Sequence, residues 1–486
     1  MLKVNDVTFK YVGEESRGIF DVNLDVNKGE CILLCGKSGC GKTTITRLIN
    51  KLVPYFYEGN LKGNLTIDDH KIEKLDMYEV SEKVGSVFQN PRSQFFNVDT
   101  DSEISFGMEN LSYPREVIKE RLKKTTKDLN IENLLNRDIF KLSGGEKQKI
   151  AFASIYAMSP EVFVLDEPSS NLDTKAIEEL RRNISLLKKQ GKTIIISEHR
   201  LYYLKDLVDK VVYMDKGYIK NIYSMEKFNE LSIEERYKMG LRAIDLSKVK
   251  MSIKESKFKS EEVLEIKNVS LRYNKNNVLQ NISFKVKRGE VIGIIGGNGA
   301  GKSTFSRTLC GLNKKYDGDF YFNGHKVDNK SRLKLSYMVM QDVNYQLFAE
   351  SVLNECKFGI KDADEELVET TLKELGLYGY RNVHPNTLSG GQKQRLAVAV
   401  SIVCKKEILI FDEPTSGLDY NSMIQVSRLI NKLSDMGKIV FIVTHDYEFV
   451  SQVCNRVIHF HNHKVLKDVK VNENNREFLE GFFIGS

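Results

Sequence analysis

The chain has 486 residues, of which 41% are hydrophobic and 29% are charged, and its formal net charge is +7. This length exceeds what one hydrophobic core normally supports, and the composition is that of a globular protein, so a single small domain and a disordered chain are both excluded. The basic excess is spread along the chain and does not by itself choose between nucleic acid and an anionic membrane surface as a partner.

Neither the N-terminus nor the apolar runs predict export or a membrane span. The chain opens with MLKVNDVTFKY, which carries charges at positions 3 and 6 and lacks the apolar core of a signal peptide. The longest apolar runs, such as 291–297 and 438–445, fall far short of the roughly 20 residues that cross a bilayer and are typical of buried parallel strands.

The seven cysteines contain no C-x-x-C pair, which argues against a disulfide framework and a zinc site. We therefore expect a protein of the reducing cytoplasm.

The same motifs occur twice, in the same order. GKSGCGKTT at 36–44 returns as GGNGAGKST at 296–304, LSGGEKQK at 142–149 as LSGGQKQR at 388–395, and VFVLDEPSSNLD at 162–173 as ILIFDEPTSGLD at 408–419. From the LSGG motifs onward the offset between the copies stays at 246 residues, as expected when the insertions fall in earlier loops. We predict two domains, over 1–224 and 262–486.

The charged segment 225–261 between them predicts a partly helical linker with a helix start at Ser232, which we expect to be a solvated connector.

The first motif of each half is a phosphate-binding loop. GKSGCGKT fits the pattern G-x-x-x-x-G-K-[ST] between an apolar strand and a helical stretch. Its glycines allow backbone N–H groups to face phosphate oxygens, its lysine adds positive charge, and the hydroxyl that follows is a Mg²⁺ ligand. The predicted nucleotide-binding residues are Gly36, Lys37, Ser38, Gly39, Cys40, Gly41, Lys42, Thr43 and Thr44 in the first half, and Gly296, Gly297, Asn298, Gly299, Ala300, Gly301, Lys302, Ser303 and Thr304 in the second.

Two acidic residues end an apolar strand in each half. VFVLDEP and ILIFDEP place their carboxylates where an α/β sheet presents ligand-binding groups. The first carboxylate, Asp166 or Asp412, is expected to hold Mg²⁺ directly or through water. The second, Glu167 or Glu413, is placed to orient or deprotonate the water that attacks the γ-phosphate.

The LSGG motifs, taken with the phosphate loops and the DEP strands, resemble the signature of the ATP-binding cassette (ABC) superfamily over almost the whole of both halves. The resemblance implies an α/β fold of two P-loop NTPase domains. Each would contain a mainly parallel core sheet, an antiparallel β subdomain and a helical subdomain. It further implies ATP and Mg²⁺ as ligands, ATP hydrolysis, and a head-to-tail pairing in which the signature of one cassette closes over the nucleotide of the other.

The resemblance also assigns two composite sites. One would join Lys42, Gln89, Asp166, Glu167 and His199 to Ser389, Gly390 and Gly391, and the other would join Lys302, Gln341, Asp412, Glu413 and His445 to Ser143, Gly144 and Gly145. In the family, the glutamine lies near Mg²⁺ and the attacking water, and the histidine touches the γ-phosphate. Tyr11 and Tyr273 match the aromatic that stacks on adenine, with a buried strand aromatic as the alternative.

Both halves keep the glutamate and the histidine, so we expect two hydrolytically competent sites. Two differences are expected to make their rates unequal. Arg200 stands where the second half has Asp446, and Asn171 stands where it has Gly417.

A second resemblance concerns the loop after each glutamine. VFQNPRSQFF at 87–96 and its looser counterpart VMQDVNYQLF at 339–348 resemble the loop of energy-coupling factor (ECF) transporter ATPases that receives a membrane subunit. This resemblance implies an importer of vitamins or transition-metal ions that needs an integral membrane coupling subunit and a separate membrane substrate-binding subunit. The ATPase would lie at the cytoplasmic face of the membrane, with one fused chain per transporter and no nucleic acid. Phe95 and Phe96 would pack in or beside the docking groove, or alternatively in the core.

The alternative function is that of a soluble tandem ABC protein acting on the ribosome. That family commonly has a long charged helical linker and departs from histidine at the γ-phosphate position, whereas this chain has a linker of roughly 40 residues and keeps both histidines. A chromosome or repair ATPase would need long coiled coils between phosphate loop and signature, and the spacing leaves no room for them.

One further pattern could bind a metal. His459, His461 and His463 alternate in HFHNHK and would share one face of a strand. The segment aligns with YMDKGY at 213–218, which predicts a hairpin whose turn precedes the last histidine, so we do not expect a metal site there.

Overall fold

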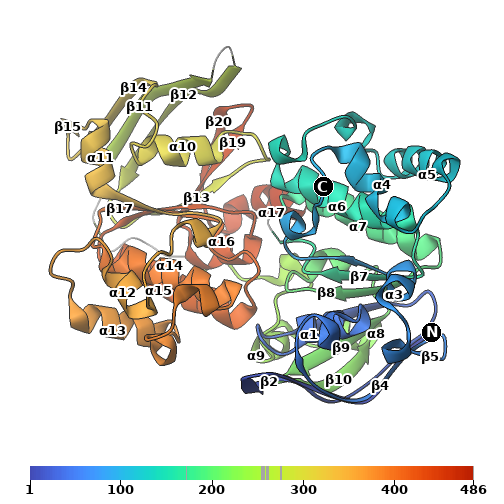
Figure 1. The fold of residues 1–486 in the computed structure, drawn as a ribbon. Coiled ribbons are helices and arrows are strands. Elements are labelled where there is room, and N and C mark those ends of the chain that lie inside the picture. Colours follow the sequence, from blue (N-terminus) through green and yellow to red (C-terminus); the bar gives the residue numbers. More distant parts are fainter. Residues whose placement is uncertain (171, 253–257, 259–261, 274–275, 485–486) are drawn as a thin grey trace. The chain divides into compact units, whose positions relative to one another are not determined.

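The structure is a computed structural model that describes residues 1–170, 172–252, 258, 262–273 and 276–484. The chain divides into two compact units, Met1–Asp245 and Leu246–Ser486, which Figure 1 shows in sequence colours. Each unit contains one cassette and is described by itself.

The strands of the first unit form two sheets. A four-stranded antiparallel sheet has the order β2-β1-β4-β5, and a six-stranded sheet has the order β10-β9-β3-β8-β7-β6. The strands are β1 Leu2–Tyr11, β2 Glu14–Val26, β3 Cys31–Gly36, β4 Gly59–Ile67, β5 His70–Lys71, β6 Val84–Val87, β7 Val162–Asp166, β8 Thr193–Ser197, β9 Lys210–Asp215 and β10 Tyr218–Ser224. All pairs of the larger sheet are parallel except β9 with β10.

Helices cover both faces of the larger sheet. The helices of the first unit are α1 Lys42–Ile49, α2 Leu52–Tyr55, α3 Met77–Lys83, α4 Thr100–Asn110, α5 Arg115–Asp128, α6 Gly144–Met158, α7 Thr174–Lys189, α8 Met225–Glu230 and α9 Ile233–Lys238. Figure 1 shows α1 on one face of the sheet and α6 and α7 on the other. This layering explains why β3, β7 and β8 are apolar without alternation, since every residue in them is buried.

Neighbouring residues of one strand contribute to different cores. Leu33 and Leu165 pack with α6 and α7, whereas Leu34 and Val164 pack with α1 and the antiparallel sheet. The strands that carry site residues are therefore fixed from both sides.

The parallel register brings the carboxyl ends of the central strands to one edge. Asp166 at the end of β7 pairs with Ser197 at the end of β8, and β3 ends beside them at Gly36. In an open parallel sheet this edge is where ligands bind. The phosphate loop starts at this edge. Asp166, Glu167 and His199 lie at this edge or directly after it.

The second unit repeats this architecture, with sheet orders β12-β11-β14-β15 and β16-β17-β18-β13-β19-β20. Its strands are β11 Glu262–Tyr273, β12 Asn276–Lys287, β13 Val291–Ile295, β14 Asp317–Phe322, β15 His325–Lys326, β16 Ser336–Val339, β17 Ile408–Asp412, β18 Ile439–Val443, β19 Arg456–His461 and β20 Lys464–Lys470. Its helices are α10 Lys302–Leu309, α11 Asn329–Leu335, α12 Val352–Lys357, α13 Glu365–Glu374, α14 Gly390–Val403, α15 Tyr420–Asp435, α16 Tyr447–Val453 and α17 Arg476–Ile484. The predicted fold class is confirmed, with a mainly parallel core sheet, an antiparallel sheet and helices in each cassette.

The segment after β10 is not the solvated connector that its charge predicts. Its helix α9 begins at the expected place, where Ser232 and Glu235 form a capping box. Phe228 and Ile244 lie in the core of the first unit, and the Tyr213 hydroxyl donates to the Met239 carbonyl. Apolar residues spaced among the charges thus fold 225–245 onto the first cassette. The expectation for 253–257 and 259–261 falls on residues outside the described part of the chain.

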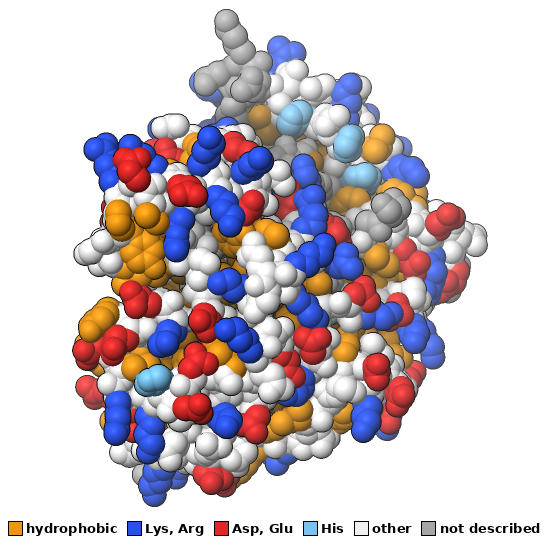
Figure 2. All heavy atoms as spheres, turned by 90° about the vertical axis from the view of Figure 1, so that its right-hand side faces the viewer, with side chains coloured by type: hydrophobic (Ala, Val, Ile, Leu, Met, Phe, Trp, Pro, Cys, Tyr) orange, Lys and Arg blue, Asp and Glu red, His pale blue; other side chains and the backbone are white. Residues whose placement is uncertain are grey.

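Within the described residues, no helix combines the length and the apolar character that crossing a membrane requires. Figure 2 shows one face of the molecule, on which basic and acidic side chains are interspersed. This distribution agrees with a net charge that is spread along the sequence.

Candidate active site

The phosphate loop of each unit has the backbone that its glycines predict. Helix α1 follows Gly41, whose φ of 107° lies in a region that side chains disfavour. A Cβ atom at Gly41 would lie 2.8 Å from the Cγ2 of Ile19, so a larger residue there would be both strained and crowded. Gly301 has a φ of 102° before α10. The loops are therefore shaped to present backbone N–H groups to an anion, as a nucleotide phosphate requires.

The loop lysines are buried and folded over their own loops. Lys42 is 4% exposed, and its Nζ donates to the carbonyls of Gly36 and Lys37, each at 3.2 Å. In the second unit the Nζ of Lys302 donates to Gly296 at 2.6 Å and to Gly297 at 3.1 Å. A buried ammonium group that donates to backbone carbonyls of the loop is well placed to pair with an incoming phosphate.

A hydroxyl and a carboxylate meet below each loop. Thr43 Oγ1 lies 3.4 Å from Asp166 Oδ1, and Ser303 Oγ lies 3.3 Å from Asp412 Oδ2. Burial raises the pKa of Asp412, which the Ser303 hydroxyl and the Lys302 charge partly offset. These oxygens fit Mg²⁺, which prefers hard oxygen ligands and would stabilise the buried carboxylate.

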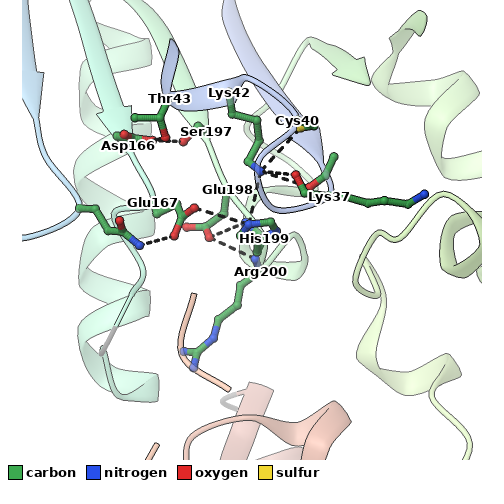
Figure 3. Close-up of polar contacts among 12 residues, drawn as sticks. Lys37, Cys40, Lys42, Thr43, Asp166, Glu167, Ser197, Glu198, His199 and Arg200 are labelled. Carbon is green, nitrogen blue, oxygen red and sulfur yellow. Dashed lines mark hydrogen bonds and ion pairs between the residues drawn. The ribbon is translucent and has the colours of Figure 1, made fainter. Parts of the chain in front are cut away.

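The candidate base, the glutamine and the histidine come together in the first unit. The Nε2 of Gln89 donates to Glu167 Oε2 at 2.6 Å, and His199 Nε2 lies 3.5 Å from Glu167 Oε1. The same histidine nitrogen lies 3.3 Å from Lys42 Nζ, which Figure 3 shows. Four residues from four segments thus converge on one point above the phosphate loop.

In the second unit the histidine lies against the glutamate in the same way. His445 Nε2 lies 3.6 Å from Glu413 Oε1. Here the Oε2 of Glu413 also faces the loop around the histidine, with the Thr444 hydroxyl and the His445 N–H each 3.4 Å away. Gln341 follows β16, the counterpart of the β6 strand that precedes Gln89.

The signature residues begin long helices. Ser143 caps α6 and Ser389 caps α14, each through a capping box with the residue three positions on. Gly144, Gly145, Gly390 and Gly391 form the first turns of these helices. Their contact with a nucleotide stays a prediction. Asp173 and Asp419, in the SNLD and SGLD motifs, cap α7 and α15 by accepting from the N–H groups of Ala176 and Ser422. Asn171 lies outside the described residues.

Tyr11 lies beside the phosphate loop of its own cassette. Its hydroxyl is 3.1 Å from Thr44 Oγ1 and accepts from Arg47 at 3.4 Å. Stacking on adenine stays a prediction for Tyr11, and the side chain of Tyr273 lies outside the described part of the structure.

A second glutamine in each loop supports the loop's backbone. Gln94 accepts from the Phe88 N–H at 3.3 Å and donates to the Ser86 carbonyl at 3.0 Å. Gln346 makes the same pair of bonds, with Met340 at 2.7 Å and with Met338 at 2.7 Å. Each side-chain amide therefore extends the sheet edge and fixes the loop after the first glutamine. In the sequence, the constant five-residue spacing of the two glutamines could have indicated this supporting role.

A buried glutamate holds the aromatic end of each loop. Glu103 Oε2 accepts from the N–H groups of Phe96 at 3.0 Å and Asn97 at 2.8 Å. Glu355 Oε2 accepts in the same way from Phe348 at 2.8 Å and Ala349 at 2.7 Å. Sequence reasoning missed these two residues, which lie 252 positions apart and so match the offset of the loops.

The histidine pattern lies in a hairpin, as the repeat predicts, but the last histidine is not past the turn. Strand β19 ends at His461 and β20 begins at Lys464, so Asn462 and His463 form the turn itself. Over the described ranges, no three His, Cys, Asp or Glu side chains are grouped so as to hold a metal ion.

Comparison with known proteins decides the family. The family model described as "ABC transporter" matches residues 19–170 and 279–416, which together exceed half of the chain. The chain is a tandem ABC protein. Membership of this family implies ATP binding, normally with Mg²⁺, and ATP hydrolysis. The ABC cassettes of this chain each contain a phosphate loop, an acidic pair, a signature and a histidine in the expected places.

Similar proteins extend over nearly the full length of this ABC chain. It is 48% identical over 474 residues to a Treponema denticola protein named "Putative ABC transporter ATP-binding protein", with 96% of this chain and 97% of that protein covered. A protein of the same description from Clostridium perfringens is 32% identical, with 96% and 90% covered.

The structure also resembles a solved one described as "Model of ribosome-bound archaeal Pelota and ABCE1". The TM-score is 0.72 at 22% identity, with 98% of this chain and 80% of that chain covered. At this identity the likeness shows the fold alone.

Proposed function

We propose that this chain is the ATP-hydrolysing subunit that energises an ABC importer of the energy-coupling factor type, which takes up a vitamin or a transition-metal ion. The proposal joins the ATPase chemistry implied by the family with a docking surface present on each cassette. The transport part is supported by the names of the similar proteins, which read "Putative ABC transporter ATP-binding protein".

Aromatic side chains at the surface of each cassette carry the proposal. Phe96 is 75% exposed and stacks on the half-buried Phe106, with ring centroids 4.9 Å apart. The second cassette has Phe348, 66% exposed, and Phe358, 62% exposed, at the matching positions. Phe95 packs against the core of the first unit, so the two neighbouring aromatics divide between the core and the surface.

This surface is held in a fixed shape. Glu103 and Gln94 hold its two ends in the first cassette, and Glu355 and Gln346 do so in the second. Contiguous exposed apolar patches commonly mark interaction sites. An apolar helix of a membrane subunit fits such a patch.

The loop also touches the candidate active site. Gln89 precedes the docking residues by only a few positions, and its side chain holds the Glu167 carboxylate. A displacement of the loop by a partner would therefore move the group that orients the candidate base. This connection is how ATP hydrolysis and the membrane subunit would act on each other.

The chemistry at each site follows from the residues that converge there. Glu167 and Glu413 would orient and deprotonate the attacking water, with Gln89 or Gln341 and the histidine positioning the reacting groups. Bound Mg²⁺, held by Thr43 and Asp166 or by Ser303 and Asp412, would neutralise charge on the β- and γ-phosphates. The head-to-tail pairing, which would add Ser389 or Ser143 to these sites, stays a prediction of the family resemblance.

The proposed partners are an integral membrane coupling subunit and a separate membrane substrate-binding subunit. One fused chain would serve each transporter, at the cytoplasmic face of the membrane and without nucleic acid. Solute choice would then lie with the substrate-binding subunit.

The docking surface is tested by Phe96→Ser combined with Phe348→Ser in the full-length tagged chain. We expect the pair to abolish recovery of an integral membrane subunit from solubilised membranes while ATP binding is retained. Ile222→Ser with Leu466→Ser is the matched control, because these apolar residues are also exposed but lie on β10 and β20. Equal recovery with both pairs would contradict the assignment of this surface.

A further inference from the structure

A pocket on the first cassette lies away from the candidate active site. Its volume is about 310 Å³, and it is lined by residues of α5, of the last turn of α6 and of the segments that follow α6 and α7. Ser159 and Lys192, at its edge, come shortly before β7 and β8, whose carboxyl ends carry Asp166 and Ser197. A five-residue strand is about 16 Å long, so the pocket lies at the opposite edge of the sheet from the phosphate loop.

Three cationic side chains line this pocket. Arg121 and Lys124 come from α5, which packs on α6 (Figure 1), and Lys192 comes from the segment after α7. Within the described part of the chain, no carboxylate forms an ion pair with any of the three. The pocket therefore gathers positive charge that the cassette itself does not neutralise by ion pairing.

The cations repel one another at Lys192. Burial lowers the pKa of Lys192 below its ordinary value of 10.5, and the charges of Arg121, Lys28 and Lys124 lower it further against the opposing effect of Glu161. The Glu161 carboxylate lies 3.9 Å from Lys28 Nζ, so it is shared with a cation outside the pocket. An anion bound among these side chains would relieve the repulsion.

The walls of the pocket are polar and fixed in place. Tyr156 is buried, and its hydroxyl accepts from Gln190 Nε2 at 2.7 Å and donates to Asp128 at 2.8 Å. The Arg121 guanidinium lies over the Tyr113 ring, 4.9 Å from the ring centroid. Groups that are held in this way lose little freedom when a ligand binds, which favours affinity.

Helix capping explains only part of this arrangement. Arg121 Nη1 donates to the carbonyls of Ala157 at 3.3 Å and Met158 at 2.9 Å, and Lys192 Nζ donates to the Ser159 carbonyl at 2.9 Å. Both cations thus serve the carboxyl end of α6. These bonds use only some of the available donors, because a guanidinium group has five N–H donors and an ammonium group has three.

The second cassette has no counterpart of this cation group. Four of the corresponding positions, each 246 residues further on, carry uncharged side chains: Leu367, Thr370, Ile402 and Met436. Lys438 stands at the position of Lys192, but it pairs with Glu407 at 2.6 Å. The cassette fold therefore does not require these side chains, and helix α14 ends without an arginine at the position of Arg121. The cation group is a feature of the first cassette.

We propose that this pocket binds a small soluble anion that carries at least two negative charges on phosphate groups. Arginine and lysine side chains are the usual partners of phosphate oxygens, and Ser159 and Gln190 add hydrogen-bonding groups at the edge. The volume falls at the lower end of the range for ligand pockets, roughly 300–1,000 Å³, which fits a phosphorylated metabolite. The inference adds a ligand to the proposed function and does not depend on it.

The residues around the pocket favour a soluble ligand over a lipid. Among its described lining residues, none is a large apolar side chain exposed at the surface. A site for a lipid headgroup would be expected to place such side chains beside the cations, so that they enter the membrane.

Titration calorimetry of the full chain with inorganic pyrophosphate tests the site. Both phosphate loops are first saturated with Mg²⁺ and the nonhydrolysable β,γ-imido analogue of ATP, so that the probe cannot bind there. We expect one pyrophosphate per chain, with a Kd below about 1 mM. Absence of saturable binding under these conditions would overturn the proposal.

Variants show whether the pocket holds the probe. We expect Lys124→Gln to weaken pyrophosphate binding at least about threefold, and Arg121→Gln with Lys192→Gln to abolish it. The matched control is Lys119→Gln with Lys123→Gln, which removes two charges from the same helix outside the pocket, and we expect it to change the Kd less than about twofold. Equal weakening by the control would show that only the general charge of the helix attracts the probe, and it would overturn the proposal.

Lys124→Gln keeps the test decisive if the double variant does not fold. Arg121 and Lys192 also cap α6, whereas the Lys124 side chain makes no ion pair or hydrogen bond with described residues. Its loss is therefore expected to leave the thermal unfolding midpoint unchanged. An unchanged Kd for pyrophosphate in folded Lys124→Gln would contradict the assignment of the pocket.

Sedimentation with vesicles separates a soluble ligand from a lipid headgroup. Phosphatidylcholine vesicles with and without phosphatidic acid are compared for the parent chain, Lys124→Gln and the Lys119→Gln with Lys123→Gln control. We expect the three chains to sediment equally. Loss of binding to the acidic vesicles in Lys124→Gln alone, without pyrophosphate binding by the parent, would assign the pocket to a lipid headgroup and overturn the proposal.

Discussion

The side-chain amide of Gln89 donates to the Glu167 carboxylate across 2.6 Å, so the residues after β6 and β7 are joined at the candidate active site. Removing this donor in Gln89→Ala would leave the carboxylate less well oriented toward water. We expect kcat at the first site to fall about tenfold with little change in ATP affinity, because positioning affects the transition state more than binding. Phosphate release and ATP binding, measured with Gln341→Ala as the matched variant, check this. A change in affinity alone would count against the assigned role.

The two glutamates are expected to act as the bases of hydrolysis. Glu167→Gln combined with Glu413→Gln keeps side-chain size but removes the basic oxygens. We expect turnover to fall by at least about 100-fold, the usual contribution of a general base, while ATP still binds. Phosphate release measures the first effect and equilibrium binding of ATP the second. Full turnover in the double variant would show that neither glutamate is needed for hydrolysis.

The capping boxes of the two signature helices differ in one charge, and this predicts a pH dependence. Burial alone would raise the pKa of Glu146, but hydrogen bonds from the N–H and hydroxyl of Ser143 hold it below its ordinary value of 4.5. Because the pKa is lower in the folded state, the charged cap stabilises the protein above about pH 4.5 and is lost as the pH falls through the folded value. The second cassette has the neutral Gln392 at this position.

We therefore expect Glu146→Gln to lower stability by about 0.5–1 kcal/mol at pH 7, the size of other helix caps, and by less as the pH approaches 4. Thermal unfolding of the parent and variant over this pH range measures the difference. Gln392→Glu is the reverse control and should acquire the same pH dependence. A constant difference between parent and Glu146→Gln at all pH values would contradict the account.

The sequence predicted the reactive groups of the site, but it did not predict the side chains that hold those groups in place. The phosphate loops, the acidic pairs and the histidines fall into continuous motifs at strand ends, and the parallel register brings them together as expected. Glu103 and Gln94 act on residues a few positions away through backbone groups, and such contacts leave no pattern in residue type. The buried Glu198 carboxylate accepts from the N–H of Ser169, which lies 29 positions away along the chain, and such a contact is visible only in three dimensions.

The linker illustrates the other limit of sequence reasoning. Its charged residues suggested exposure, yet Met225, Phe228, Leu241 and Ile244 lie in the core of the first unit. These residues follow no single helical period, because two short helices and an irregular stretch carry them. Composition alone could not distinguish this arrangement from a solvated tether.

Glu103 is expected to keep the docking loop in shape rather than to act in hydrolysis. Glu103→Ala would leave the partly buried N–H groups of Phe96 and Asn97 without their acceptor, at a cost of at most about 1–3 kcal/mol. Hydrogen exchange at these two amides should accelerate while ATP binding is unchanged, and Glu355→Ala should do the same at Phe348 and Ala349. Unaltered exchange at all four amides would show that the carboxylates do not hold the loops.

The central claim is that the chain energises a membrane importer. The most direct measurement is native mass spectrometry of the full-length tagged chain extracted with detergent from membranes of cells that produce it naturally. We expect one copy of the chain bound to an integral membrane coupling subunit and a membrane substrate-binding subunit, in a complex whose ATPase activity is lost with Glu167→Gln and Glu413→Gln. Recovery of the chain with ribosomes and without any membrane subunit would contradict the account.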